Sequence, residues 1–341
     1  MLIGGAELLV RTALRLAHRL HVRPLIIGLS LVAFGSTAPQ LTVSLQAAYL
    51  GAPDVAVGSV IGSNIFNILV ILGLAALLIP LRVSWQLVRL DIPLMIIASA
   101  LVYLLALNGY LGRLEGVLLL VGLIGYLAVL WHQSRHHART YPAPAPASVT
   151  PRRFWVVAVT QILIGLALLS LAGHLVLEAA VEVATDLGLS ERIIGLTVVA
   201  VCTSLPELAA ALIAALRGER EIAVGTVIGS NLFNLLAVLG FTAVVTPQPL
   251  SISPNALDFD LPIMLGVAVL CLPVFYSGYR ITRAEGLVFL FLYLAYGLHI
   301  VTFTTGMALA ERLEGVMLSY VLPILGIALL YTTVRAWRRQ H

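Results

Sequence analysis

Long apolar runs, separated by short polar or charged segments, follow one another along the whole 341-residue chain. Most runs approach the roughly 20 residues that a helix needs to cross the hydrocarbon core of a bilayer. The pattern predicts eleven helices, over residues 1–20, 24–50, 54–80, 87–108, 114–132, 153–187, 191–217, 220–246, 257–277, 283–301 and 313–335. We therefore expect an all-α membrane protein.

Composition supports this expectation. Hydrophobic residues make up 60% of the chain and charged residues 11%, whereas about a quarter of a soluble domain is charged. All 20 basic residues are arginines, and they are scattered among the apolar runs rather than gathered on one face. This distribution favours determinants of membrane topology over a nucleic-acid surface. The lipid bilayer is the expected partner, and the short loops are typical of a multi-pass protein of a prokaryotic inner membrane.

The chain contains the same pattern twice. Residues 26–80 align without a gap on residues 193–247, at an offset of 167, and roughly half of the 55 positions are identical, including Gly, Asn and Pro positions. Hydrophobicity alone does not produce such a match, so the two stretches indicate a duplication. The predicted domains are a first repeat over 1–132, a cytoplasmic Pro/Ala/His/Arg linker over 133–152, a second repeat over 153–301, and an extra transmembrane helix with an Arg-rich tail over 302–341.

Helix parity predicts that the two repeats are inverted. Each copy holds five helices, an odd number, so the second copy enters the membrane from the opposite side. If the N-terminus is placed outside, sixteen arginines fall in the inner loops and tail and only three in the outer loops. This bias follows the positive-inside rule. Inverted repeats with interrupted helices at the midplane are typical of secondary transporters.

A proline interrupts the second helix of each copy near the middle of its apolar run. The stretch from Gly35 to Gln40, with Pro39, corresponds to residues 202–207, with Pro206. Proline lacks an N–H and disfavours helical geometry in the preceding residue, so we expect broken helices at 35–40 and 202–207. Such backbone survives at membrane depth only where protein or water satisfies it. Together with nearby side chains, its carbonyls provide the oxygen ligands that hard cations prefer.

The next helix of each copy carries a glycine and asparagine motif, Gly-x-x-x-Gly-Ser-Asn-x-x-Asn. The glycines allow helices to approach closely, and asparagines three residues apart share one face of a helix. We assign packing or bridging roles to Pro39, Pro206, Gly58, Gly62, Asn64, Gly225, Gly229 and Asn231.

These two paired motifs resemble the alpha-repeats of the sodium/calcium exchanger (cation/calcium antiporter) superfamily, especially its bacterial branch. The resemblance covers the first ten helices. It implies that the second and seventh helices cross the third and eighth to form ion sites, and that the first and sixth helices slide to give alternating access. Carried over by position, the implied ion ligands are Ser36, Thr37, Gln40, Asn67, Thr203, Ser204, Glu207 and Asn234.

The chain departs from the family pattern in its charge. The family usually has a glutamate in both repeats, whereas the first repeat here has Gln40, and Asn234 stands where some members have aspartate. Glu207 alone neutralises one monovalent ion, and a divalent ion would leave about one uncompensated charge at a costly depth. We expect exchange of Ca²⁺ for Na⁺ or H⁺. The alternatives are a monovalent cation/proton antiporter with little Ca²⁺ transport and a non-transporting membrane sensor or scaffold.

Other function classes lack a signature. The sequence has no evident nucleophile–base arrangement and no His/Cys/Asp spacing typical of a resident metal, so we expect neither enzymatic activity nor a cofactor. It also lacks a nucleotide-binding loop, which argues against ATP as a partner. The expected solutes are small inorganic cations: Na⁺, H⁺ and Ca²⁺. The sequence does not define the oligomeric state.

Overall fold

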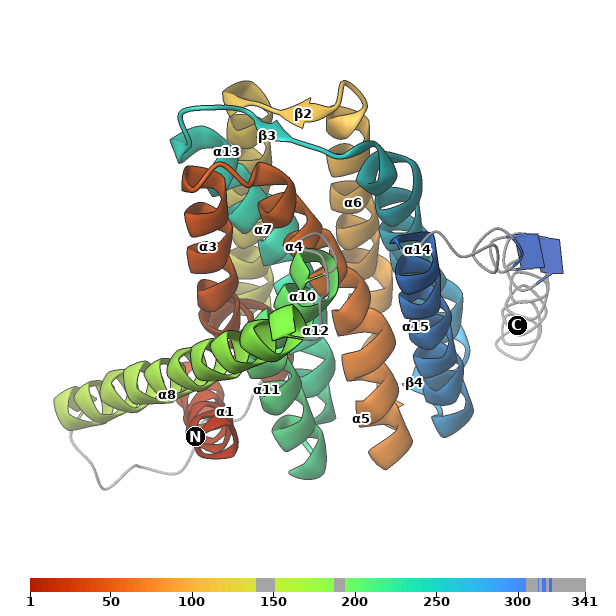
Figure 1. Cartoon of the computed structure of the whole chain (residues 1–341). Coiled ribbons are helices and arrows are strands. Elements are labelled where there is room, and N and C mark those ends of the chain that lie inside the picture. Colours follow the sequence, from red (N-terminus) through yellow and green to blue (C-terminus); the bar gives the residue numbers. More distant parts are fainter. Residues whose placement is uncertain (139–150, 187–193, 305–311, 313–314, 317–318, 321–341) are drawn as a thin grey trace.

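The computed structural model describes residues 1–138, 151–186, 194–304, 312, 315–316 and 319–320. Within these residues, eight helices are long and apolar enough to cross a membrane, or nine if one bent helix pair is counted as a single span. The centre of the predicted linker and most of the predicted eleventh helix lie outside the described residues. The expected all-α, multi-pass membrane architecture is confirmed (Figure 1).

The first repeat begins with α1 and ends with α7. Its elements are α1 (Leu2–Leu20), α2 (Pro24–Ile27), η1 (Gly28–Val32), α3 (Ala33–Tyr49), α4 (Pro53–Phe66), η2 (Asn67–Leu72), α5 (Gly73–Leu78), β1 (Leu81–Arg82), η3 (Leu87–Asp91), α6 (Ile92–Ala106), β2 (Tyr110–Leu111) and α7 (Arg113–Ala138). The η segments are π-helical turns inside longer helices.

The second repeat follows the same order. Its elements are α8 (Pro151–Asp186), η4 (Ile194–Val199), α10 (Ala200–Thr203), α11 (Leu205–Leu216), α12 (Arg220–Phe233), η5 (Asn234–Val238), α13 (Leu239–Val245), β3 (Leu250–Ser251), η6 (Ala256–Asp260), α14 (Leu261–Tyr276), β4 (Arg280–Ile281) and α15 (Arg283–Thr304). The three π-helical turns of the first repeat thus recur at equivalent places in the second. Such turns are rare and frequently occur at functional sites.

The helix break predicted at residues 202–207 is confirmed. α10 ends at Thr203, α11 begins at Leu205, and the two segments meet at an angle of 45°. Ser204, between them, has φ −91° and ψ 2°, outside the α-helical region. Pro206 lies in the first turn of α11, where its missing N–H costs no helical hydrogen bond. The motif therefore starts a new helix inside the span.

The break predicted at residues 35–40 is wrong as an interruption, because α3 is continuous from Ala33 to Tyr49 and contains Pro39. The helix tolerates the loss of one backbone hydrogen bond at the proline. The hydroxyls before it also bond within the helix, since Ser36 and Thr37 each donate to the Ala33 carbonyl, at 3.2 and 2.6 Å. The irregular turn of this span is η1, upstream of the motif. The two copies thus differ at their shared proline.

Two short antiparallel ribbons connect the repeats at opposite ends of the bundle. β1 of the first repeat pairs with β4 of the second, and β2 pairs with β3 (Figure 1). Leu81 faces Ile281 in one ribbon, and Leu111 faces Leu250 in the other. Each ribbon therefore joins one strand from each half, as an approximate twofold relation between inverted repeats requires.

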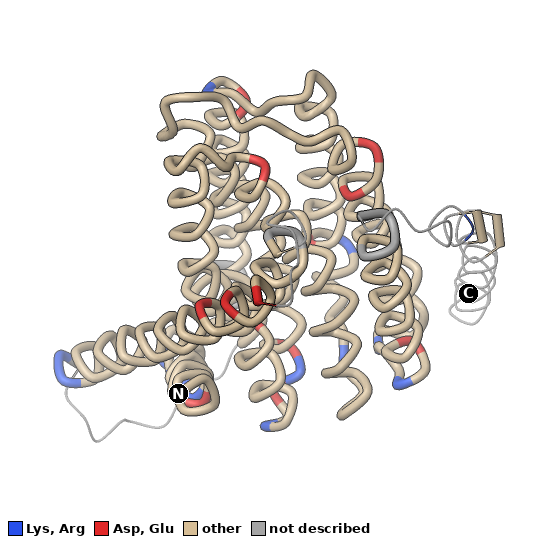
Figure 2. Tube along the Cα trace, in the orientation of Figure 1, with Lys and Arg blue, Asp and Glu red and all other residues tan. Residues whose placement is uncertain are grey.

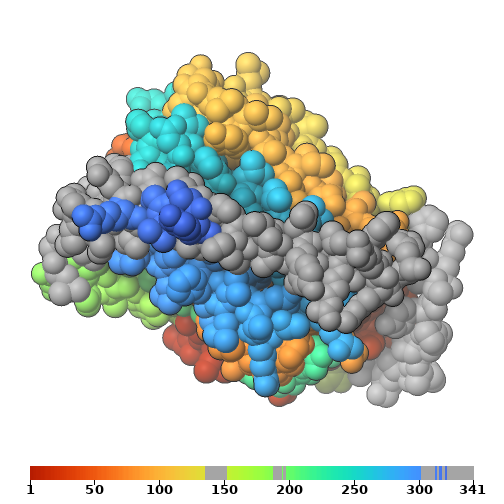
Figure 3. Space-filling model, turned by 90° about the vertical axis from the view of Figure 1, so that its right-hand side faces the viewer, coloured from red at the N-terminus to blue at the C-terminus, as the bar shows by residue number. Residues whose placement is uncertain are grey.

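Charged residues mark the ends of this bundle. In Figure 2, the long middle stretches of most helices carry neither acidic nor basic residues, and the charges gather mainly near the helix ends. Figure 3 shows residues of the first repeat (orange) bordering residues of the second (cyan and blue) on one face, so the two repeats form one body.

Glycine contacts hold the repeats together at the centre. Gly229 on α12 packs so closely against the second helix of the first repeat that an added Cβ would lie 2.7 Å from both the Leu29 carbonyl and the Ala33 Cβ. Gly225, one turn earlier, would place a Cβ 3.0 Å from the Leu25 carbonyl. The predicted packing role of these glycines is consistent with this geometry.

Gly229→Ala is therefore expected to destabilise the protein, although alanine is the better helix former by up to ~1 kcal/mol. Overpacking against a neighbouring backbone typically costs about 1–3 kcal/mol, which exceeds that gain. Thermal unfolding of the detergent-solubilised protein should show a lower Tm. Gly266→Ala, in α14, is the matched control, because a Cβ there meets nothing within 4 Å. A Gly229→Ala protein as stable as the control would contradict the packing role.

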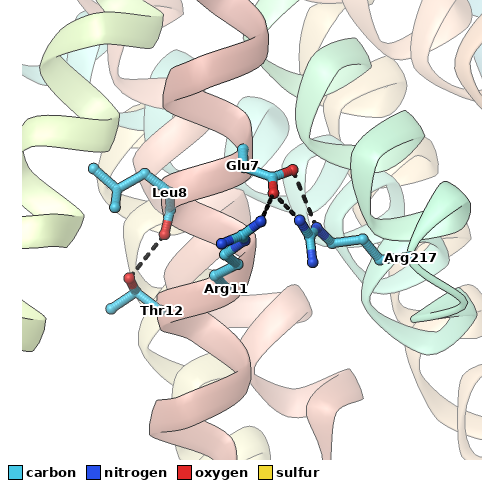
Figure 4. Close-up of polar contacts among 5 residues, drawn as sticks. All are labelled: Glu7, Leu8, Arg11, Thr12 and Arg217. Carbon is cyan, nitrogen blue, oxygen red and sulfur yellow. Dashed lines mark hydrogen bonds and ion pairs between the residues drawn. The ribbon is translucent and has the colours of Figure 1, made fainter.

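α1 and α8 pack against each other beside the bundle. α8 runs obliquely across the front of the molecule, at a large angle to the upright helices of the bundle (Figure 1). α1 and α8 cross at Gly5 and Gly165, where a Cβ on Gly5 would lie 2.9 Å from the Gly165 carbonyl. Glu7 on α1 pairs with Arg217, which follows α11 at the end that the arginine pattern places inside (Figure 4). This ion pair joins the first half of α1 to the C-terminal end of α11.

Candidate ion-binding site

A cluster of buried polar side chains lies where the broken and proline-containing helices pack against α4 and α12. Each of its members is at most 4% exposed. They are Ser36, Thr37, Gln40, Ser59, Ser63, Asn64, Asn67, Thr203, Ser204, Glu207, Thr226, Ser230, Asn231 and Asn234. Glu207 is the one ionisable side chain among them. A polar cluster this deep in a membrane bundle is costly unless its groups are paired or used.

Gln40 lies on α3, one residue after Pro39, and both ends of its amide are engaged. Its Nε2 donates to the Ser59 hydroxyl at 2.9 Å and approaches the Ser44 hydroxyl at 3.5 Å. Its Oε1 accepts from the Ser63 hydroxyl at 3.3 Å. The Gln40 side chain is thus fixed against α4 of its own repeat.

Ser63 connects this group to the other repeat. Its hydroxyl lies 3.1 Å from the Ala200 carbonyl, on the segment before the helix break, and 3.4 Å from the Thr203 hydroxyl. The approximate twofold relation gives a matching contact, in which Ser36 and Ser230 hydroxyls lie 3.4 Å apart. Each repeat therefore presents a hydroxyl of its Gly-Ser-Asn motif to the proline-motif helix of the other.

Glu207 lies in the first turn of α11, directly after the break. Its carboxylate lies beside the hydroxyls of Ser36 and Thr37 on α3 of the first repeat, and its Oε2 has no hydrogen-bond partner. A carboxylate in the first turn is favoured by the positive end of the helix dipole. The bend at Ser204 thus places the single negative charge of the cluster between the two repeats.

Four asparagines form a reciprocal bridge between the central helices. Asn67 Nδ2 donates to Asn231 Oδ1 at 3.0 Å, and Asn234 Nδ2 donates to Asn64 Oδ1 at 2.9 Å. Asn231 Nδ2 in turn donates to the Asn64 carbonyl at 3.2 Å. Asn67 and Asn234 each begin a π-helical turn, which widens the helix at that point. With their nitrogens engaged, both leave their Oδ1 atoms without a partner.

Several oxygens of this cluster have no hydrogen-bond partner. Within the described part of the chain, the buried side-chain oxygens of the cluster without a hydrogen-bond partner are Asn67 Oδ1, Glu207 Oε2, Thr226 Oγ1 and Asn234 Oδ1. A buried polar atom without a partner costs roughly 1–3 kcal/mol. Amide, hydroxyl and carboxylate oxygens are the ligands of Na⁺ and Ca²⁺, so a transported cation would satisfy these atoms. The donor set fits such an ion.

All eight predicted ligand positions fall in or beside this cluster. Ser204 is at the bend itself, and the other seven lie on the segments that meet there. Asn64 and Asn231 lie where the sequence predicts a bridge between helices. The sequence interpretation did not include Ser59, Ser63, Thr226 and Ser230. Ser63 and Ser230 belong to the repeated Gly-Ser-Asn motif and stand four residues before Asn67 and Asn234, a spacing that places them on the same helix face.

Two further buried carboxylates lie outside the cluster. Asp91 and Asp260 end the equivalent turns η3 and η6, and both are fully buried. Tyr296 donates to Asp260 at 2.9 Å, and Asp91 lies near Gln86 and Arg23. Asp260 thus has a hydrogen-bond partner on α15, whereas neither carboxylate oxygen of Asp91 has one.

Fold and site together define a multi-pass membrane protein of the inverted-repeat transporter class, with a cation-compatible site between its halves. Comparison with known proteins is more specific. The sodium/calcium exchanger protein family model matches residues 1–132 and 157–302. The chain belongs to the sodium/calcium exchanger family.

Individual relatives match along most of their length. The chain is 37% identical to the putative antiporter CaxA of Alkalimonas amylolytica, covering 87% of this chain and 94% of CaxA. It is 37% identical to inner membrane protein YrbG of Escherichia coli (79% and 84% covered) and 29% identical to sodium/calcium exchanger MaX1 of Methanosarcina acetivorans (86% and 94%). A structure of the sodium-calcium exchanger NCX_Mj, soaked with Na⁺ and Sr²⁺, matches with a TM-score of 0.72 at 27% identity, covering 86% and 92%.

Proposed function

We propose that this chain is a secondary active antiporter that exchanges Ca²⁺ for Na⁺ or H⁺ by alternating access. The ions compete for one oxygen-lined site centred on Glu207, with the eight predicted ligands and the serines of the Gly-Ser-Asn motif around it. The host membrane is a prokaryotic inner membrane, in line with the name of the relative YrbG.

One observation carries this proposal: a single buried carboxylate lies between the two inverted repeats, surrounded by hydroxyl and amide oxygens of both. Glu207 of the second repeat faces Ser36 and Thr37 of the first, and Ser63 of the first faces Thr203 of the second. A site shared by two inverted halves is exposed to one side or the other when one part of the protein moves. The α1–α8 pair, which meets through glycines, is the moving part in this scheme.

Counterflow in proteoliposomes tests the proposal. The full-length chain is reconstituted into vesicles loaded with radioactive Ca²⁺, and release is measured into buffers that contain Na⁺, K⁺, Ca²⁺ or an imposed proton gradient. Release should need a counter-ion outside and should rise with its concentration. A channel would release Ca²⁺ without a counter-ion, and a sensor or scaffold would release none. Either result would contradict antiport.

The charge of the site supports a second candidate, exchange of monovalent cations and protons with little Ca²⁺ transport. Glu207 balances one monovalent ion, whereas bound Ca²⁺ leaves about one net positive charge in a buried site. The same vesicles, loaded with Na⁺ and challenged with a proton gradient, distinguish the two functions. Weak protein sites for Ca²⁺ have dissociation constants of up to about 1 mM. Fast sodium/proton exchange that Ca²⁺ at about 1 mM neither drives nor inhibits would therefore favour this second candidate.

A further inference from the structure

The two halves of the site are not equivalent, although the fold repeats them. Gln40 and Glu207 occupy matching positions at the 167-residue offset, and so do Ser59 and Thr226. In the first half, Gln40 donates to Ser59 at 2.9 Å. In the second half, Glu207 Oε2 and the Thr226 hydroxyl are both without a hydrogen-bond partner. The side chains at these two positions are therefore hydrogen-bonded to each other in the first repeat and not in the second.

In the first half, hydrogen bonding engages Gln40 and Ser59, while Asn67 Oδ1 stays without a partner. The amide nitrogen of Gln40 directs its hydrogens toward the hydroxyl oxygens of Ser59 and Ser44. The Ser59 hydroxyl in turn donates a hydrogen bond to the Ala56 carbonyl at 3.0 Å. The amide oxygen accepts from Ser63. An amide NH₂ carries partial positive charge and repels a cation. The NH₂ group of Gln40 thus lies next to the hydroxyl oxygens of Ser59 and Ser44, in the position that a cation bound to these oxygens would occupy.

The second half keeps its oxygens available. Three of the four unpaired oxygens of the cluster belong to the second repeat: Glu207 Oε2, Thr226 Oγ1 and Asn234 Oδ1. Glu207 and Thr226 are 2% and 0% exposed, so water does not compensate them at the surface. Unlike the amide of Gln40, the ionised carboxylate donates no hydrogen and can only accept or coordinate.

We propose that this chain carries one cation at a time, held in the half of the site around Glu207 and Thr226, because the amide of Gln40 fills the equivalent half. The inference rests on the proposed antiport function and adds its stoichiometry and a further ion ligand. Occupancy by a second cation would require displacing the Gln40 amide from Ser59 and would place two cations beside a single carboxylate. Binding of one Na⁺ then prevents the binding of one Ca²⁺, and binding of one Ca²⁺ prevents that of one Na⁺.

Isothermal titration of the purified full-length protein in detergent measures this stoichiometry. Titration with CaCl₂ in a sodium-free choline buffer should give one Ca²⁺ per chain. Competition by NaCl should follow a Hill coefficient near one. Two or more Ca²⁺ per chain, or a clearly cooperative Na⁺ displacement, would overturn the inference. Counterflow is measured separately. If the titration shows more than one bound cation but counterflow still depends on a counter-ion, the proposed antiport stands and only the stoichiometry is wrong. If the parent protein shows no counterflow, the proposed antiport itself is wrong.

A matched pair of variants tests the second half. Thr226→Val removes the proposed ligand hydroxyl with little change of shape and should weaken Ca²⁺ binding by about tenfold. Thr242→Val is the control, because Thr242 lies on the same membrane span and is also fully buried with an unpaired hydroxyl. It stands 16 residues further along, about 24 Å at the α-helical rise, and should leave affinity unchanged. Both variants should unfold at similar temperatures. Equal Ca²⁺ affinities in the two variants would overturn the assignment of Thr226.

Discussion

Glu207→Gln is expected to abolish counter-ion-dependent flux in proteoliposomes while the protein still folds. The substitution keeps the size of the side chain and removes the single negative charge of the cluster. Without this negative charge, a cation must leave water for a site that offers only neutral hydroxyl and amide oxygens, at a depth where uncompensated charge is costly. We expect at least a hundredfold loss of Ca²⁺ or Na⁺ exchange, equivalent to about 2.7 kcal/mol of binding free energy.

Glu178→Gln provides the matched control for Glu207. Glu178 lies on α8 with its side chain 63% exposed, where it pairs with His174. The same loss of charge there should leave flux within about twofold, because exposed ion pairs contribute little. Size-exclusion profiles and unfolding temperatures of both variants show whether folding is retained. Flux in Glu207→Gln equal to that of the control would sink the proposed function.

The second large effect is expected from Gln40→Glu, which restores a carboxylate in the first half of the site. The new carboxylate can accept hydrogen bonds from Ser59 and Ser63 instead of donating to the first. Its attraction for a divalent ion is twice that for a monovalent ion at the same distance. We expect the preference for Ca²⁺ over Na⁺, measured as a ratio of binding constants, to rise by about tenfold or more.

Gln46→Glu controls for the added charge. Gln46 lies on the same helix, α3, with an exposed side chain. A carboxylate there changes the net charge of the protein equally but cannot reach the buried cluster. If Gln40→Glu and Gln46→Glu give the same ion preference as the parent protein, position 40 does not contribute to the site.

Much of this architecture follows from sequence symmetry. An ungapped match at Gly, Asn and Pro positions indicates a duplication, and an odd number of helices per copy then requires inversion. Glu207 stands out because a carboxylate in the middle of an apolar run has few structural uses. The broken helix at 202–207 follows from proline chemistry. Each of these inferences can be drawn from the sequence pattern alone.

The parts that sequence reasoning missed depend on contacts between the repeats. The same proline rule predicts a break at Pro39, yet α3 absorbs the lost hydrogen bond and stays continuous. Ser63 and Ser230 look like ordinary small residues of a packing motif until the fold places each beside the opposite repeat. The pairing of Gln40 with Ser59 likewise depends on how α3 packs on α4. No local pattern encodes these distances.

The two ribbons bear on the evolutionary origin of the protein. Each pairs a strand of one half with a strand of the other, and the asparagine bridge is likewise reciprocal. A gene encoding a single half would therefore produce a chain with both strand edges unpaired and half of the bridge missing. A second copy inserted with the opposite topology would supply all of these partners. An ancestral antiparallel homodimer, later fused into one reading frame, accounts for every one of these crosswise contacts.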